Sequence, residues 1–216
     1  MDIMTAVLTR RSQHQLVEPA PNDQEFAYLL RAAATAPDHG RLRPWRWILV
    51  RDEGRIALGR CFADECAGPG FRRGQVEAKT QRAPLLATLV FSPVLNDTGR
   101  GSPVPEWEQL AATSAMAGFL ILLLHARGFG SVWRTGRFTE SERIRRVLGL
   151  RPEERLMGWL YIGTPQRLGS STRRVTEDVT DRISVFAPEP PASPSASIPR
   201  TRAVASSGAA QRAGGL

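Results

Sequence analysis

Several residue types that mark particular classes of protein are scarce in this chain of 216 residues. Its only two cysteines, Cys61 and Cys66, stand five positions apart. Two cysteines are too few for a disulfide framework or for the four ligands of a structural zinc site, and no other Cys or His is placed to complete a site with His39. We therefore expect free thiols in a reducing compartment and no metal site.

Lysine is almost absent. Of 29 cationic residues only Lys79 is a lysine, and the arginines are spread from Arg10 to Arg212. The formal charge of +8 would favour nucleic acid if the cations were clustered, because each phosphate contact releases counterions. Since the cations are scattered, we expect no nucleic-acid partner and keep an arginine-rich nucleic-acid binder only as an alternative class.

Long apolar runs are missing as well. Residues 1–16 contain no apolar stretch of signal-peptide length. The most apolar segment, residues 110–124, includes Thr113 and Ser114 and is shorter than the ~20 residues that a bilayer requires. We expect a cytoplasmic protein without membrane contact, in which this segment is a helix buried on nearly all sides, at the centre of the domain or in a dimer interface.

The remaining composition is that of a globular protein, with 42% hydrophobic and 23% charged residues. From residue 187 onward Pro, Ser, Ala and Gly dominate and no periodicity survives. Such a segment buries too little apolar surface to offset chain entropy. We expect one folded domain at residues 1–186 and a disordered tail at residues 187–216.

The hydrophobic pattern predicts a mixed order of helices and strands, which indicates an α+β sandwich. An Asn22 or Asp23 cap begins one helix, and Thr139 with Glu142 fits a capping box that begins another. Helices are expected over 2–9, 22–36, 53–68 (ending at Gly68-Pro69), 110–130 and 139–150, and strands over 45–52, 83–94, 131–136 and 155–165.

Four short motifs are candidates for a functional site, and each has a structural alternative. They are "RRS" at 10–12, "APDHGRLRPWRW" at 36–47, "GFGSVWRTG" at 128–136 and "GTP" at 163–165. Arg10 and Arg11 either complement the dipole in the last turn of the first helix or, with Ser12, bind phosphate. Trp133 either packs in the core or borders a planar ligand, and His39 either bonds locally or contacts a ligand.

In this order the four motifs resemble the FMN-dependent nitroreductase family, in its short YdjA-type branch of NAD(P)H nitroreductases. The resemblance runs from about Met1 to Gln166 and on toward Phe186. It implies an α+β fold with a mixed sheet flanked by helices, and a homodimer with two FMN molecules in its interface. The chain departs from many relatives at Asp38, Arg41 and Arg43, where a serine and an asparagine are common.

The resemblance also implies the cofactor-binding residues. Arg10, Arg11 and Ser12 would contact the FMN phosphate or the polar edge of the flavin, and an arginine such as Arg173 or Arg174 would reach the phosphate. Thr35 and His39 of the partner chain would border the flavin, and Trp133, Arg134 and Thr135 would add contacts. The stretch associated with NAD(P) would be Leu123, Leu124, His125, Ala126, Arg127 and Gly128.

The implied activity is ping-pong hydride transfer from NAD(P)H, as co-substrate, to nitroaromatic, quinone or similar small acceptors. No catalytic amino acid is expected, because the product can take its protons from water. The alternative function is a protein that stores, senses or degrades FMN without NAD(P)H turnover. Neither the acceptor nor the choice between NADH and NADPH follows from the sequence.

Overall fold

A five-stranded antiparallel sheet is the centre of the computed structural model, which describes residues 1–66, 70–95, 103–166 and 174–186. The expected tail at 187–216 lies outside the described residues. The chain divides into a unit at Met1–Val175, which holds the sheet, and a unit at Thr176–Leu216, whose described part contains the short turn Thr180–Arg182.

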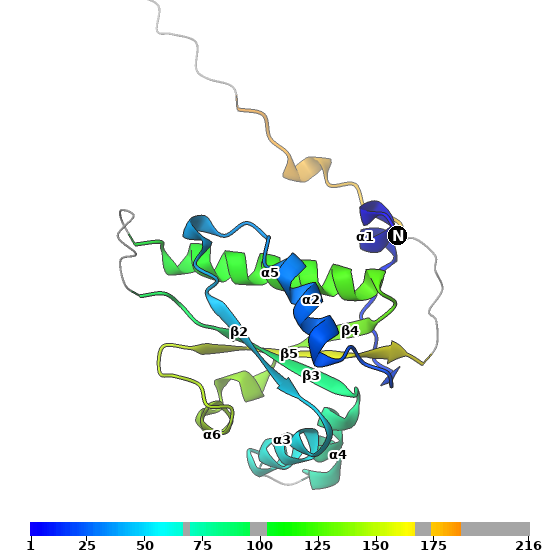
Figure 1. The fold of residues 1–216 in the computed structure, drawn as a ribbon, viewed down its shortest axis with the longest axis vertical. Helices are drawn as coiled ribbons and strands as arrows, with labels where there is room; N and C mark the ends of the chain where they lie inside the picture. Colours follow the sequence, from blue (N-terminus) through cyan, green and yellow to red (C-terminus); the bar gives the residue numbers. More distant parts are fainter. Residues whose placement is uncertain (67–69, 96–102, 167–173, 187–216) are drawn as a thin grey trace, which may run out of the picture. The chain divides into compact units, whose positions relative to one another are not determined.

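The longest strand, β5, organises the sheet (Figure 1). One edge of β5 pairs with β3, which pairs in turn with β2, and the other edge pairs with β4 and β1. All four pairings are antiparallel, and a single parallel bridge joins Ser12 to Ser131. The strands are β1 (Leu16–Val17), β2 (Trp45–Val50), β3 (Leu85–Phe91), β4 (Gly130–Arg134) and β5 (Arg155–Pro165).

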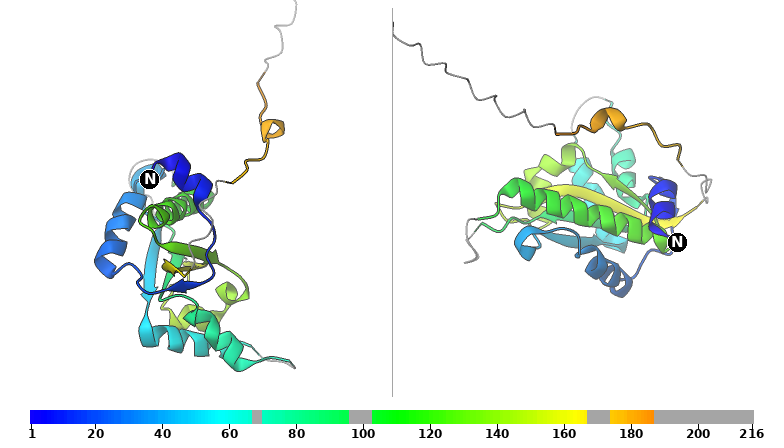
Figure 2. Two further views of the ribbon diagram at one scale, coloured as in Figure 1. Left: turned by 90° about the vertical axis from the view of Figure 1, so that its right-hand side faces the viewer. Right: turned by 90° about the horizontal axis from the view of Figure 1, so that it is seen from above.

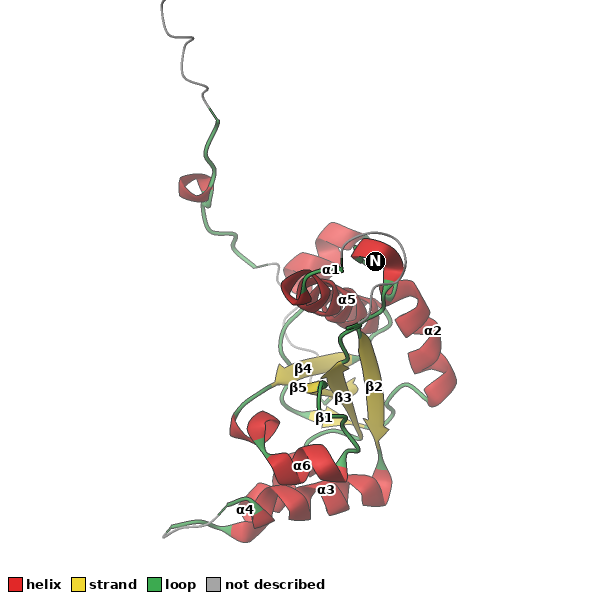
Figure 3. Ribbon diagram, turned by 90° about the vertical axis from the view of Figure 1, so that its left-hand side faces the viewer, coloured by secondary structure: helices red, strands yellow, loops and turns green. Residues whose placement is uncertain are grey.

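Helices cover both faces of the sheet and make two apolar cores (Figure 3). Helices α2 (Asp23–Ala33) and α5 (Glu106–Ala126) pack on one face, and α3 (Asp52–Asp64), α4 (Arg73–Glu77) and α6 (Glu142–Val147) on the other. Helix α1 (Ile3–Thr9) lies beside the C-terminal end of α5 (Figure 2). Because β3 is covered on both faces, all seven of its residues are buried, as its continuous apolar run predicts.

Local sequence explains the main boundaries. The Asn22 side chain accepts a hydrogen bond from the backbone N–H of Glu25 at 2.8 Å, so the expected cap begins α2. Strand β5 has the predicted limits of residues 155–165, and β2 and β3 lie within the predicted runs. Both cysteines are free, as expected.

Helix α5 differs from its prediction in its limits and in its burial. It covers Glu106–Ala126 instead of residues 110–130, and its length and composition would suffice to cross a membrane. In this structure the helix packs along the sheet, and two of its polar side chains form hydrogen bonds with the backbone of neighbouring loops. Gln109 bonds to the backbone of Val94 and Val104, and Thr113 Oγ1 donates to the Pro44 carbonyl. It is not buried on nearly all sides, because Phe119 is 43% exposed.

Other boundaries were wrong at the residue level. Helix α3 ends at Asp64, and Gly68 and Pro69 lie outside the described residues. Ser141, not Thr139, caps α6, since its Oγ accepts from the N–H of Ile144 at 3.2 Å. Thr139 instead lies in a 3-10 turn at Arg137–Glu140 and donates to the Gly136 carbonyl at 2.7 Å. Strand β1 and helix α4 were not predicted at all.

Candidate functional site

The segment after α1 lies along the edge of β4 and brings two of the predicted motifs together. Ser12 bridges Ser131, and the N–H of Gln13 donates to the Ser131 carbonyl at 3.0 Å. His14, two residues after Ser12, accepts a hydrogen bond at its Nδ1 from Arg134 Nη2 at 3.0 Å. The "RRS" and "WRT" motifs, 123 positions apart, therefore share one edge of the sheet.

Cationic side chains gather where α1 ends. Arg10 caps the helix, its N–H donating to the Ala6 carbonyl at 3.0 Å, so Arg10 and Arg11 follow the last turn and do not lie in it. Burial lowers the pKa of Arg10, and the charges of Arg174 and Arg11 lower it further. Such crowding of like charges in a partly buried place is relieved by an anion.

The two arginines of the motif differ in what they contact. Arg11 Nη1 donates to the carbonyls of Leu8 at 2.9 Å and Arg10 at 3.1 Å. Among the described residues, no carboxylate forms an ion pair with Arg10. Arg10 is therefore the better candidate for an anionic ligand.

His125, at the end of α5, faces the same cluster. Its Nε2 lies 2.8 Å from Thr9 Oγ1. Burial lowers the pKa of His125, and the charges of Arg10 and Arg11 lower it further, which keeps the imidazole neutral beside the arginines.

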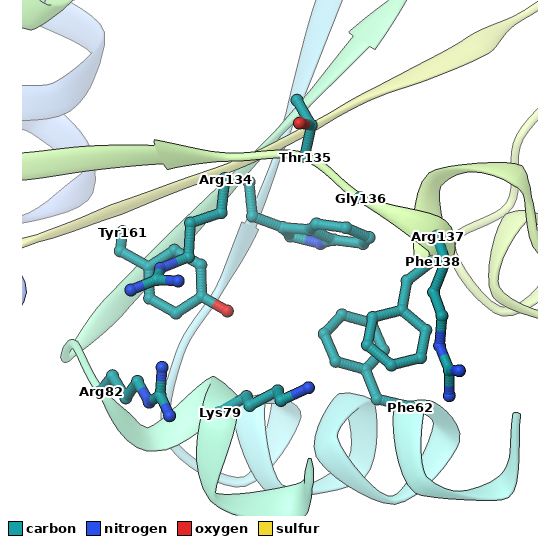
Figure 4. Close-up of a pocket in the computed structure, with 10 residues that line it drawn as sticks. Phe62, Lys79, Arg82, Arg134, Thr135, Gly136, Arg137, Phe138 and Tyr161 are labelled. Atoms are coloured by element: carbon teal, nitrogen blue, oxygen red, sulfur yellow. The ribbon is translucent and has the colours of Figure 1, made fainter. Parts of the chain in front are cut away.

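A cavity of about 430 Å³ lies beside Arg134 and Thr135, at the end of the β4 edge that is farther from the Arg10 cluster (Figure 4). It combines four cationic with four aromatic side chains, and none of the described residues that line it is an Asp or a Glu. Two of the predicted residues, Arg134 and Thr135, belong to its wall. The lining residues are Phe62, Lys79, Arg82, Arg134, Thr135, Gly136, Arg137, Phe138, Trp159 and Tyr161.

Backbone geometry at two glycines shapes this wall. Gly136 follows β4 with φ 123° and Gly158 lies in β5 with φ 111°, a region that favours glycine. A side chain at Gly158 would overlap the carbonyl oxygen of Arg134, so β5 and β4 approach this closely only because the residue is glycine. The pairing of β3 with β5 also shifts register beside Gly158.

The aromatic side of the cavity is packed in place. Phe62 and Phe138 stack with centroids 4.4 Å apart, and Trp159 meets Phe62 edge-on at 4.9 Å. Lys79 Nζ and the Arg137 guanidinium lie 5.5 and 5.2 Å from the Phe138 centroid. The rings form a rigid apolar wall, and the cations lie at its border.

Two of the side chains that line the cavity, Arg134 and Trp159, each contain a buried nitrogen donor. Arg134 Nε and Trp159 Nε1 are buried and have no hydrogen-bond partner among the described residues. Burial raises the pKa of Tyr161, an effect that the charges of Arg134 and Arg82 reduce. The four cationic side chains of the wall favour a ligand that carries acceptor atoms.

Several predicted site residues lie apart from this cavity within one chain. Thr35 Oγ1 donates to the Ala32 carbonyl at 2.8 Å, and Thr35 borders a separate apolar cavity of about 420 Å³ beside Phe119 and Leu123. His39 Nδ1 lies 2.9 Å from Glu108 Oε2, near the start of α5 and not its His125 end. Both assignments to a flavin of the partner chain stay predictions.

The remaining assignments also stay predictions. Trp133 is half-buried against the core and its Nε1 donates to the Met157 carbonyl at 3.0 Å, which fits the structural alternative. In the stretch 123–128, Leu124 is fully buried and Arg127 pairs with Glu25 at 3.1 Å. Of that stretch only His125 is seen to reach the Arg10 cluster.

Sequence reasoning missed eight of the ten residues that line the cavity, and also His14 beside it. Lys79 and Arg82 come from the turn before β3, Tyr161 from β5 and His14 from the segment after "RRS". Of these four, only Lys79 carried a signal, because it is the single lysine of an arginine-rich chain. The other three are recognised only through contacts between distant segments.

Comparisons with known proteins are consistent across sequence and structure. Residues 7–164 match the sequence profile described as "Nitroreductase family". The Escherichia coli protein named "Putative NAD(P)H nitroreductase YdjA" is 32% identical over 186 residues, which cover 86% of this chain and all of that protein. A Haemophilus influenzae protein with a similar name is 29% identical over 184 residues, covering 82% of this chain and 96% of that protein.

Solved structures share the fold at lower identity. A nitroreductase-like family protein from Bacillus cereus superposes with a TM-score of 0.73 at 22% identity, over 86% of this chain and 96% of its own. The FMN and NADPH-dependent nitroreductase NfnB from Sphigopyxis sp. strain HMH gives 0.60 at 18% identity, over 87% of this chain and all of its own.

Proposed function

The chain belongs to the nitroreductase family and is an oxidoreductase, and we propose that it binds FMN and uses NAD(P)H to reduce small acceptors such as nitroaromatics and quinones. The observation that carries this proposal is the arrangement along β4. An arginine cluster at Arg10 lies at one end of this edge, and a cavity of aromatic and cationic side chains lies at the other.

The dimensions of this edge suit the proposed cofactor. Ser131 and Arg134 are three residues apart, which in a strand is about 10 Å. FMN has a phosphate at one end and a planar ring with acceptor atoms at the other, joined by a short ribityl chain. The Arg10 guanidinium and the Ser12 hydroxyl would hold the phosphate, and the cavity would hold the ring.

The cations of the cavity fit the ring as well. Lys79, Arg82 and Arg134 line it, and no carboxylate is among its described lining residues. When bound, FMN supplies the hydride chemistry that no amino acid can perform. Lys79, Arg82 and Arg134 would place positive charge beside the bound ring, and the stacked Phe62 and Phe138 would exclude water from that edge.

We also propose that the working form is a homodimer. Helix α1 and helix α5 expose Ile3, Met4, Val7 and Phe119, and the apolar cavity beside Thr35 opens among them. Exposed apolar patches of this kind mark association surfaces. A partner covering this face would bring its own loop 35–39 toward the flavin, which accounts for predicted residues that lie away from the cavity within one chain.

Initial-rate kinetics test the reaction. NAD(P)H and the acceptor would use the same open face of the ring in turn, so plots of reciprocal rate against reciprocal NADPH at several acceptor concentrations should be parallel lines. Intersecting lines would contradict the ping-pong scheme. A yellow protein that does not oxidise NADPH with any nitroaromatic or quinone would instead favour FMN storage, sensing or degradation.

A further inference from the structure

Tyr161 carries the one phenolic hydroxyl among the described residues that line the cavity, where most other polar groups are the cationic side chains of Lys79 and three arginines. It is in the middle of β5 and is 4% exposed. Figure 4 shows its hydroxyl turned into the cavity, toward the space that the side chain of Lys79 also enters. No hydrogen bond of this hydroxyl to another described residue is seen, so its proton is available to a ligand.

The position of this ring is fixed from both sides. The backbone of Tyr161 pairs with Leu86 in β3 and with Val132 in β4. The guanidinium of Arg134 lies 5.6 Å from the ring centroid, and His14 holds that guanidinium through a 3.0 Å hydrogen bond. A side chain held by two strands and a cation keeps its hydroxyl in one place, as a preorganised donor requires.

Burial also determines the protonation state of the hydroxyl. Because burial raises the pKa of Tyr161, the phenol stays protonated at neutral pH even with Arg134 and Arg82 nearby. It therefore presents an O–H donor and not an oxyanion. A hydrogen bond from a donor that is buried beside cations becomes stronger when its acceptor gains negative charge.

We propose that Tyr161 is a catalytic residue whose Oη–H donates a hydrogen bond to an acceptor atom on the edge of the flavin ring and binds the reduced, negatively charged ring more tightly than the oxidised ring. This inference rests on the proposed function. It deepens that proposal by assigning to this side chain a part of the control over the reduction potential of bound FMN.

The test compares Tyr161→Phe with Tyr28→Phe in the FMN-loaded protein. Tyr28 is the only other tyrosine and is exposed on α2, so the control removes the same atom far from the cavity. The readout is the midpoint potential of bound FMN, measured spectroscopically against reference dyes. Losing a hydrogen bond to a charged acceptor should weaken binding of the reduced form about tenfold relative to the oxidised form, which lowers the potential by about 30 mV.

A second measurement distinguishes a lost donor from a general disturbance. Fluorotyrosine incorporated into the Tyr28→Phe protein labels Tyr161 alone and makes its phenol a stronger donor with nearly the same shape. The potential should then rise, opposite to the change in Tyr161→Phe. Equal potentials in all four proteins, or shifts of the same sign in both Tyr161 proteins, would overturn the assignment.

The outcomes also separate this inference from the proposed function. If unmodified protein and Tyr28→Phe both fail to bind FMN, the proposed function is wrong and no potential exists to compare. If both bind FMN with the same potential as Tyr161→Phe, the proposed function stands and the role of Tyr161 is refuted.

Discussion

The proposed FMN site gives its largest single role to Arg10. Arg11 uses its guanidinium on the carbonyls of Leu8 and Arg10, whereas Arg10 has no ion pair among the described residues. The sequence motif "RRS" indicated an anion site but could not distinguish the two side chains. Their difference follows from how α1 ends, which only the structure shows.

Replacing Arg10 tests this distinction. Arg10→Ala should raise the FMN dissociation constant by tenfold or more, because a charge-assisted hydrogen bond contributes about 1.5–3 kcal/mol. Arg60→Ala, on the exposed face of α3, is the matched control and should leave the constant unchanged. Fluorescence titration of the flavin-free protein measures both, and equal constants for the two variants would remove Arg10 from the site.

Glu154 is a buried carboxylate that forms ion pairs with Arg46 and Arg151. Its side chain is fully buried and accepts hydrogen bonds from Arg46 at 2.7 and 2.8 Å and from the backbone and side chain of Arg151. These donors lower its pKa from 4.5 to about 2. Because the folded pKa is depressed, the stabilisation is complete above pH 4.5 and is lost as the pH falls toward 2.

Glu154→Gln should therefore destabilise the protein by about 3 kcal/mol at pH 7, since it leaves the Arg46 guanidinium without its counter-charge. The difference from the unmodified chain should shrink as the pH falls below 4.5. Denaturant unfolding at several pH values measures it. Glu153→Gln removes a neighbouring, partly exposed ion pair to Arg151 and should cost less than about 1 kcal/mol; similar losses in both variants would refute the role of Glu154.

At the scale of elements, β5 assembles the site by pairing on both edges. It carries Gly158, Trp159 and Tyr161, and it holds β4 so that Arg134 faces Tyr161. The apolar run at 155–165 predicted this strand with its exact limits. It could not predict which strands pair with β5, because pairing partners are set by contacts between distant segments.

Because contacts between distant segments cannot be read from local sequence, only some residues of the candidate site could be predicted. Arg134 and Thr135 stand in a recognisable motif, whereas Lys79 and Arg82 lie in a turn whose local sequence signals nothing beyond polarity. The capping error at Thr139 has a local cause, since Ser141 competes for the same role two residues later. Prediction thus succeeded for long periodic elements and failed where tertiary pairing decides.

Gly158 gives an element-scale prediction. Gly158→Ala places a methyl group against the Arg134 carbonyl at a positive φ, so β4 must move away and unfolding should become easier by about 2 kcal/mol or more. Gly74→Ala is the control, because Gly74 lies in α4 with open space around it and should be neutral or slightly stabilising. Thermal unfolding compares the two, and equal midpoints would contradict this account of the β4–β5 contact.

For the whole molecule, the proposed homodimer rests on the exposed apolar residues of α1 and α5. Phe119 lies in this face beside Leu123 and the predicted Thr35. Sequence reasoning expected the long helix to be buried either in the domain or in a dimer interface. The exposure of Phe119 within a single chain favours the second alternative.

Phe119→Glu should shift the protein from dimer to monomer and weaken FMN retention, because a charge in an apolar interface lacks solvent and partner. Ile56→Glu is the control, since Ile56 is similarly exposed at 45% but lies on α3, on the opposite face of the sheet. Light scattering at micromolar concentration gives the mass of both. A monomeric unmodified chain, or a dimer that survives Phe119→Glu, would contradict the proposed interface.

The most direct test of the central claim is the visible spectrum of the purified chain, mixed with excess FMN and freed of unbound flavin. The account predicts a yellow protein with one FMN per chain, whose flavin absorbance is lost on anaerobic addition of NADPH. Colourless protein after loading with FMN would contradict it.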